Sequence, residues 1–244
     1  MFRLKWFQKA IAEATGPIRT VFSVVSGVWK LAVELGVVSG ENPVSTIKRP
    51  RIDNQRNRFF TKAEAVALLS ILKNNSADTH DVALLSLFSG LRIGECLSLT
   101  WADINLEEGR IFVKDTKNKR NRHAYITAEI REMLTGRYQR QTKAERIFGR
   151  GKPLPLATTT RKQFNQAVND LGFNDGIIDR RQKLVFHSLR HTFASWLVQM
   201  GKPLYTVSRL MGHSSIKMTE RYAHLAPETQ RAAAMELEGI LDKA

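Results

Sequence analysis

Short apolar stretches recur at three- and four-residue steps along most of this chain, and glycine or proline ends nearly every one of them. That spacing places apolar side chains on one face of a helix, and the breakers mark where each helix stops. The stretches lie at about residues 20–36, from 61 onward, 81–88, 91–100, 127–136, 160–171, 187–200, up to 211, and 227–241. A chain of many short amphipathic helices must fold by packing them against one another.

Only one region alternates in the manner of strands. Residues 110–115 and 122–126 show the two-residue period, and the polar run TKNKRN between them carries three cations. Two short strands joined by a polar turn predict an antiparallel hairpin. The fold class is therefore mainly α within α+β, a helical domain with a small antiparallel sheet.

A basic segment divides the chain. Residues 46–58 hold five cations against the single acidic Asp53, and Pro50 lies inside the segment. Such composition is typical of a linker. We expect a short helical segment at residues 1–45, the linker at 46–58 and a larger domain at 59–244.

The net charge of +15 requires a polyanionic partner, either nucleic acid or an anionic membrane surface. The most apolar run, Val21 to Val38, is interrupted by Lys30 and Glu34, so we expect no membrane-spanning helix. Cys96 is the only cysteine, which excludes an internal disulfide and a four-thiolate zinc site. A reducing, cytoplasmic compartment is the natural one.

Two arginines occupy apolar surroundings. Arg92 lies in SGLRIGECLSLTW and Arg190 in VFHSLRHTFASWL. A cation in such a setting needs an anion, and Glu95, three residues after Arg92, can supply one. Taken singly, each arginine is more typical of a structural ion pair than of a functional site.

The histidines and one tyrosine are further candidates. His187 shares a helix face with Arg190, and His213 follows a glycine. His187 and His191 have the spacing of zinc ligands, but HSLRH lacks the glutamate of HExxH, so packing or a local hydrogen bond suits His191 better. Tyr222 alone would be a packing residue, since a phenol of pKa about 10 needs help to act as a nucleophile.

These residues occur in one order, Arg92, a hairpin lysine, His187-x-x-Arg190, Gly212-His213 and Tyr222. With the strings GLRIGECLSLTWADI, FHSLRHTFASWL and LMGHSSIKMTERYAHL, the set resembles the tyrosine recombinase (phage integrase) family. The resemblance covers about residues 20–242. It implies a DNA breaking-rejoining fold and a site-specific recombinase.

The resemblance also implies a role for each residue. Tyr222 would attack the scissile phosphodiester to give a 3′-phosphotyrosyl link. Arg92 and Arg190 would bind the nonbridging oxygens, and His213 would add a hydrogen bond. His187 would assist proton movement at the tyrosine. The turn lysine, Lys117 or alternatively Lys119, would protonate the leaving oxygen, and Glu95 would orient Arg92.

By the same resemblance the partner is double-stranded DNA, bound by a homotetramer of protomers that are monomers in solution. Residues 1–45 would be the closing part of a helical core-binding domain, shortened at its N-terminus. No metal, cofactor or ATP is expected, and the chain has no GxxxxGK[ST] loop. The location would be the cytoplasm, at the nucleoid. The alternatives are a non-catalytic helical DNA-binding regulator, an inactive prophage integrase remnant and an enzyme resembling type IB topoisomerases.

Overall fold

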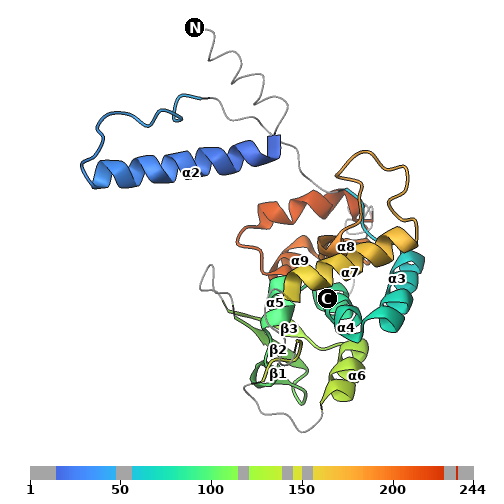
Figure 1. Ribbon diagram of the computed structural model, residues 1–244. Helices are drawn as coiled ribbons and strands as arrows, with labels where there is room; N and C mark the ends of the chain where they lie inside the picture. Colours follow the sequence, from blue (N-terminus) through green and yellow to red (C-terminus); the bar gives the residue numbers. More distant parts are fainter. Residues whose placement is uncertain are drawn as a thin grey trace. The chain divides into compact units, whose positions relative to one another are not determined.

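A computed structural model describes residues 15–47, 57–114, 121–138, 145–149, 156–227 and residue 235 (Figure 1). The chain forms two compact units, Met1–Gln55 and Arg56–Ala244. The boundary between them falls inside the basic segment at 46–58. In the described residues no helix is long and apolar enough to cross a membrane.

The first unit contains helix α2, Thr15–Glu34, which confirms the helix predicted at 20–36. Gly36 follows it with a positive φ of 67°. The apolar side chains of α2 are largely exposed, Val28 by 63%, although Phe22 is buried. The stripe that makes α2 amphipathic is thus mostly open to solvent.

The second unit is built from seven α-helices in its described part. They are α3 Lys62–Asn75, α4 Ala77–Ser89, α5 Ile93–Ser98, α6 Ala128–Arg137, α7 Leu156–Asp170, α8 Phe186–Gln199 and α9 Leu204–Met211. Helix α4 packs against α3, α5, α6, α7 and α8. Its buried side chains, among them Val82, Leu85 and Leu87, form the middle of the main hydrophobic core.

Side-chain caps set where several of these helices begin. Thr61 and Glu64 form the capping box that their spacing predicts, so α3 starts where expected. Helix α4 starts earlier than the predicted residue 81, because the Ser76 side chain accepts a hydrogen bond from the backbone of Thr79. Helix α7 likewise begins at Leu156 and not at 160.

The predicted hairpin is present as the outer part of a three-stranded antiparallel sheet in the order β1-β2-β3. The strands are β1 Ile104–Asn105, β2 Arg110–Val113 and β3 Arg122–Tyr125. Val113 pairs with Arg122 at the end of the hairpin next to the turn. The sequence pattern missed β1, which has only two residues and therefore no readable period.

One predicted helix is shorter than expected. The pattern predicts a helix at 91–100, but α5 ends at Ser98 and Leu99 is extended. Thr100 then begins a separate 3-10 helix, η1, Trp101–Asp103, because its hydroxyl and backbone N–H both donate to the Asp103 carboxylate. The break turns the chain toward the sheet.

Two left-handed glycines end the helices that lead into the site. Gly90 follows α4 with φ 68° and Gly212 follows α9 with φ 62°, as their breaker positions predict. After Gly212, two 3-10 helices, η2 Ile216–Met218 and η3 Glu220–Leu225, return the chain to α8. Lys117, Lys119 and nearly all of the predicted tail helix lie outside the described residues.

Candidate active site

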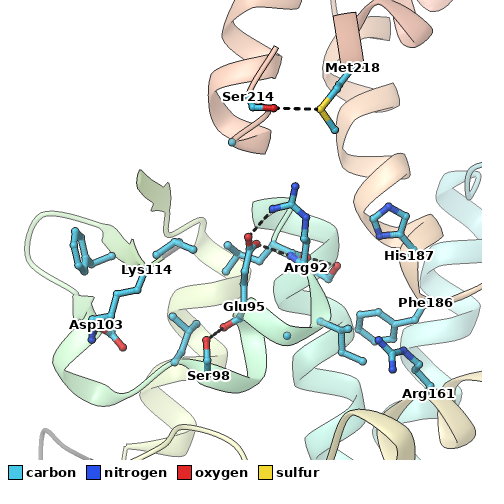
Figure 2. A pocket seen from close by; sticks show the side chains of 18 residues that line it. Arg92, Glu95, Ser98, Asp103, Lys114, Arg161, Phe186, His187, Ser214 and Met218 are labelled. Atoms are coloured by element: carbon cyan, nitrogen blue, oxygen red, sulfur yellow. Dashed lines mark hydrogen bonds and ion pairs between the residues drawn. The ribbon is translucent and has the colours of Figure 1, made fainter. Parts of the chain in front are cut away.

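A cavity of about 940 Å³ opens between α5, the end of β2, the start of α8 and the turn after α9. Its lining carries the cations Arg92, Lys114 and Arg161 and the carboxylates Glu95 and Asp103. The polar residues include Arg92, Glu95, Lys114, Arg161, His187 and Ser214. Figure 2 shows Arg92 and Glu95 in contact on α5 and His187 on α8. An opening with more cations than carboxylates suits an anionic ligand.

The carboxylate of Glu95 is the point where three arginines meet. Its oxygens lie 2.8 Å from Nη1 of Arg92, 2.8 and 3.1 Å from the two terminal nitrogens of Arg122, and 3.8 Å from Nη1 of Arg190. The backbone N–H of Arg92 also donates to it at 2.8 Å. This confirms the Arg92–Glu95 pair that the spacing predicts.

These contacts decide the charge state of Glu95. Burial alone would raise its pKa, but the hydrogen bonds and charge of Arg122, the Arg92 backbone and the charge of Arg190 outweigh burial and hold the pKa at about 2. The carboxylate is therefore ionised at every physiological pH. It serves as a permanent anion between arginines that would otherwise repel one another.

Arg190 is held by carbonyl oxygens at the ends of two helices. Its guanidinium is 2% exposed and donates Nη1 to the Gly90 carbonyl and Nη2 to the Met211 carbonyl. Both oxygens lie at helix C-termini, where the carbonyls lack intrahelical partners and the helix dipole favours a cation. Burial and the charge of Arg92 lower the pKa of Arg190 to about 9, which leaves it protonated at neutral pH.

His213 follows Gly212 and is held by Thr219, whose hydroxyl oxygen lies 2.8 Å from Nδ1. Burial, followed by the charges of Arg190, Arg92, Arg122 and Arg221, lowers the pKa of His213 to about 4. The imidazole is therefore neutral at pH 7. When Nδ1 accepts a hydrogen bond from the Thr219 hydroxyl, Nε2 carries the ring proton and can donate a hydrogen bond.

Tyr222 does not line the cavity. It is 5% exposed and packs into a small second core with Ala194, Val198, Val207 and Met211. Its hydroxyl lies 2.5 Å from Nδ1 of His191. Burial raises the pKa of Tyr222, whereas the charges of Arg221 and Arg190 lower it. The candidate nucleophile is therefore buried against α8, close enough to Arg190 for the charge of the arginine to affect the phenol.

His191 packs and forms a hydrogen bond, as expected from the sequence, but the sequence did not predict that its partner is Tyr222. It faces Tyr222, and the ring of His187 lies edge-on against it with centroids 4.6 Å apart. The four-residue spacing of His187 and His191 places both rings on one face of α8, and it is also the spacing of a zinc pair. In the part of the chain that the structure describes, no three His, Cys, Asp or Glu side chains are placed to bind a metal ion.

Arg122 was missed altogether. Nothing in its sequence surroundings separates it from the other cations of TKNKRNR, and its role depends on a contact with α5 that the chain makes only on folding. Lys114, at the end of β2, also lies at the cavity, where it pairs with Asp103 at 2.6 Å.

Comparison with known proteins gives the class to which this fold and site belong. The model of the phage integrase family matches residues 58–229. The integrase of Salmonella phage P22 is 30% identical over 203 residues, which cover 80% of this chain and 50% of that protein. The chain belongs to the phage integrase family, that is, the tyrosine recombinases.

Solved structures agree on the fold. The catalytic domain of bacteriophage HP1 integrase is 28% identical, has a TM-score of 0.59 and covers 76% of this chain and 98% of that domain. The Tn1549 transposon integrase in complex with transposon right end DNA is 20% identical with a TM-score of 0.66, over 96% of this chain and 82% of that one. The present chain spans about half to three quarters of the length of the curated relatives that it matches.

The Glu95 contacts predict an acid-dependent stability. The folded pKa of about 2 lies below the ordinary 4.5, so the contribution of Glu95 is full above pH 4.5 and is lost as the pH falls toward 2. We expect Glu95→Gln to lower the free energy of unfolding at pH 7 by about 3 kcal/mol, a difference that shrinks toward zero near pH 2. Urea unfolding at several pH values measures it.

The exposed carboxylate Glu107 provides the control. Glu107→Gln should stay within about 0.5 kcal/mol of the wild type at each pH. A Glu95→Gln deficit that stayed constant between pH 7 and pH 2 would contradict the ionised state of Glu95.

Proposed function

We propose that this protein is a site-specific DNA recombinase that cleaves and rejoins strands through a 3′-phosphotyrosyl intermediate, with neither metal nor ATP. The observation that carries the proposal is the placement of Arg92 and Arg190 on one carboxylate, Glu95, at the wall of a cavity that Arg92, Lys114 and Arg161 also line. Membership in the phage integrase family supports the same chemistry.

The two arginines differ in what they offer a phosphate. Arg92 is 41% exposed and reaches into the cavity, whereas Arg190 is 2% exposed and braced by carbonyls. Phosphoryl transfer concentrates negative charge on the equatorial oxygens, and planar guanidinium donors stabilise it. We assign phosphate binding to both, with His213 adding a neutral N–H donor.

In the proposed step Tyr222 Oη attacks the scissile phosphorus and its proton passes to a histidine. The bond to the 5′ oxygen breaks, and a turn lysine, Lys117 or alternatively Lys119, gives that oxygen a proton. The phosphotyrosine conserves the energy of the phosphodiester bond, so the reverse attack by a 5′-hydroxyl rejoins a strand. Because Tyr222 is buried on His191, the reaction includes its release toward the phosphate.

The assembly belongs to the same proposal. Residues 1–45 would act as a partial core-binding segment, 46–58 as a basic linker and 59–244 as the catalytic domain with a tail helix. Double-stranded DNA is the partner, supported by the charge of +15 and by the DNA-bound integrase of similar fold. We propose a homotetramer on DNA, formed in the cytoplasm at the nucleoid from protomers that are monomers in solution.

Covalent capture tests the function directly. On a suicide DNA substrate containing the recombination site, the wild type should form a protein–DNA adduct that survives denaturing electrophoresis and excess chelator. Tyr222→Phe should form none, since it lacks the nucleophile. Tyr205→Phe, at an exposed tyrosine, is the matched control and should react like the wild type.

Variants of Arg92 refine the same assay. Arg92→Ala and Arg92→Lys should reduce adduct formation by about 10²–10³-fold, with DNA affinity nearly unchanged because many other phosphate contacts supply it. Tight DNA binding without an adduct would favour the regulator or an inactive remnant. Relaxation of supercoiled DNA lacking any specific site would favour the topoisomerase-like enzyme.

The leaving-group lysine is tested with a 5′-bridging phosphorothiolate, whose sulfur leaves without a proton. Lys117→Ala should slow cleavage of the normal substrate and regain a near wild-type rate on the sulfur substrate. Lys114→Ala removes a hairpin lysine that is paired with Asp103, so it should show no such rescue. Rescue in Lys119→Ala alone would move the role to Lys119.

The two histidines of α8 are separated by their contacts. Of these two histidines, His191 contacts the Tyr222 hydroxyl, whereas His187 lines the cavity. If His187 accepts the proton during cleavage, His187→Gln should lower the cleavage rate and flatten its pH dependence, while His191→Gln should mainly change how readily Tyr222 is released. A flattened pH profile in His191→Gln alone would transfer the proton-accepting role to His191.

A further inference from the structure

Arg122 is the least conspicuous of the three arginines around Glu95 in the sequence, yet its side chain holds both carboxylate oxygens. Its side chain is 12% exposed and donates both terminal nitrogens to the two oxygens of Glu95, at 3.1 and 2.8 Å. This paired geometry fixes the plane of the carboxylate as well as its position. Arg92 uses the same carboxylate at 2.8 Å, so its orientation depends on that plane.

The same side chain lies against the turn that carries His213. A Cβ atom added at Gly212 would come within 2.6 Å of Cδ and 2.7 Å of Nε of Arg122. Gly212 is therefore needed twice, for its φ of 62° and for this close approach. Arg122 therefore lies against the turn that follows α9, between the end of α9 and Glu95.

Arg122 also stands at the first position of β3, paired with Val113 across the hairpin. The turn that contains Lys117 and Lys119 connects these two strands. A residue at the start of β3, bound to Glu95 on α5 and packed against Gly212, links β3, α5 and the turn after α9.

We propose that Arg122 is a positioning residue that sets the Glu95 carboxylate for Arg92 and Arg190 and fixes strand β3 and the His213 turn to them. In this role both terminal nitrogens of Arg122 stay on Glu95. The activity assay for this role rests on the proposed function, whereas the titration of His213 tests the role of Arg122 in the protein without DNA.

A lysine cannot replace this arginine. Lysine retains the charge but has a single donor nitrogen, so it cannot hold both carboxylate oxygens in one plane. Glutamine of similar length removes the charge. The pair Arg122→Lys and Arg122→Gln therefore separates the charge of Arg122 from its geometry.

The first measurement is the rate of adduct formation on the suicide substrate. Both variants should fall by about 100-fold, the cost of a displaced reacting group, while DNA affinity stays within about twofold. The control is Arg110→Gln, on the same hairpin but half exposed and paired with Glu108 instead of Glu95. Urea unfolding of each variant confirms that the rates compare folded proteins.

The second measurement uses NMR titration of His213 in the protein without DNA, with its signal assigned from His213→Gln. The cations that face this imidazole are Arg92, Arg122, Arg190 and Arg221. Arg122→Gln should raise the pKa of His213 above about 4, because one of these charges is lost while burial, the largest cause of the low pKa, remains. Arg122→Lys should leave it low although cleavage is slow.

Normal cleavage by both folded Arg122 variants would overturn the inference, as would a His213 titration that ignores Arg122→Gln. Full recovery of rate in Arg122→Lys would show that charge alone suffices and would also overturn it. An absence of adduct in the wild type would instead contradict the proposed function, while the NMR result would still report on the contact of Arg122 with this turn.

Discussion

The ionised carboxylate of Glu95 is the interaction on which the candidate site depends. Arg92, Arg122 and Arg190 come from α5, β3 and α8, and like charges at such distances repel strongly unless an anion lies between them. With its pKa held at about 2, Glu95 supplies that anion at all physiological pH values. The small sheet and the helical core are thereby joined at the point where a phosphate would bind.

Helix termini complete this arrangement. Arg190 donates to carbonyls at the ends of α4 and α9, and both helices end in left-handed glycines. The glycines let each helix stop abruptly, so that its last free carbonyls face a buried cation and not solvent. The same break after α9 places His213 beside the cluster, where burial and the neighbouring arginines keep its imidazole neutral.

The buried position of Tyr222 keeps the candidate nucleophile apart from the cavity where a phosphate would bind. Its hydroxyl lies on His191 in the second core, while Arg92 and His187 line the cavity. A phenol buried among apolar side chains, with its pKa raised, is a poor nucleophile. In the proposed reaction, cleavage therefore requires a rearrangement of η3 that exchanges the histidine contact for the phosphate.

The sequence by itself determined the mainly helical class, the hairpin, the capping box of α3, the glycine stops and the Arg92–Glu95 pair, because each follows from spacing over a few residues. The two-residue strand β1 escaped it because so short a strand has no readable period, and the early start of α4 escaped it because it depends on the Ser76 cap. Only the tertiary structure decided that Arg122 reaches Glu95 and that Tyr222 rests on His191. Those contacts join residues 27 and 31 positions apart, and such long-range pairs leave no local pattern in the chain.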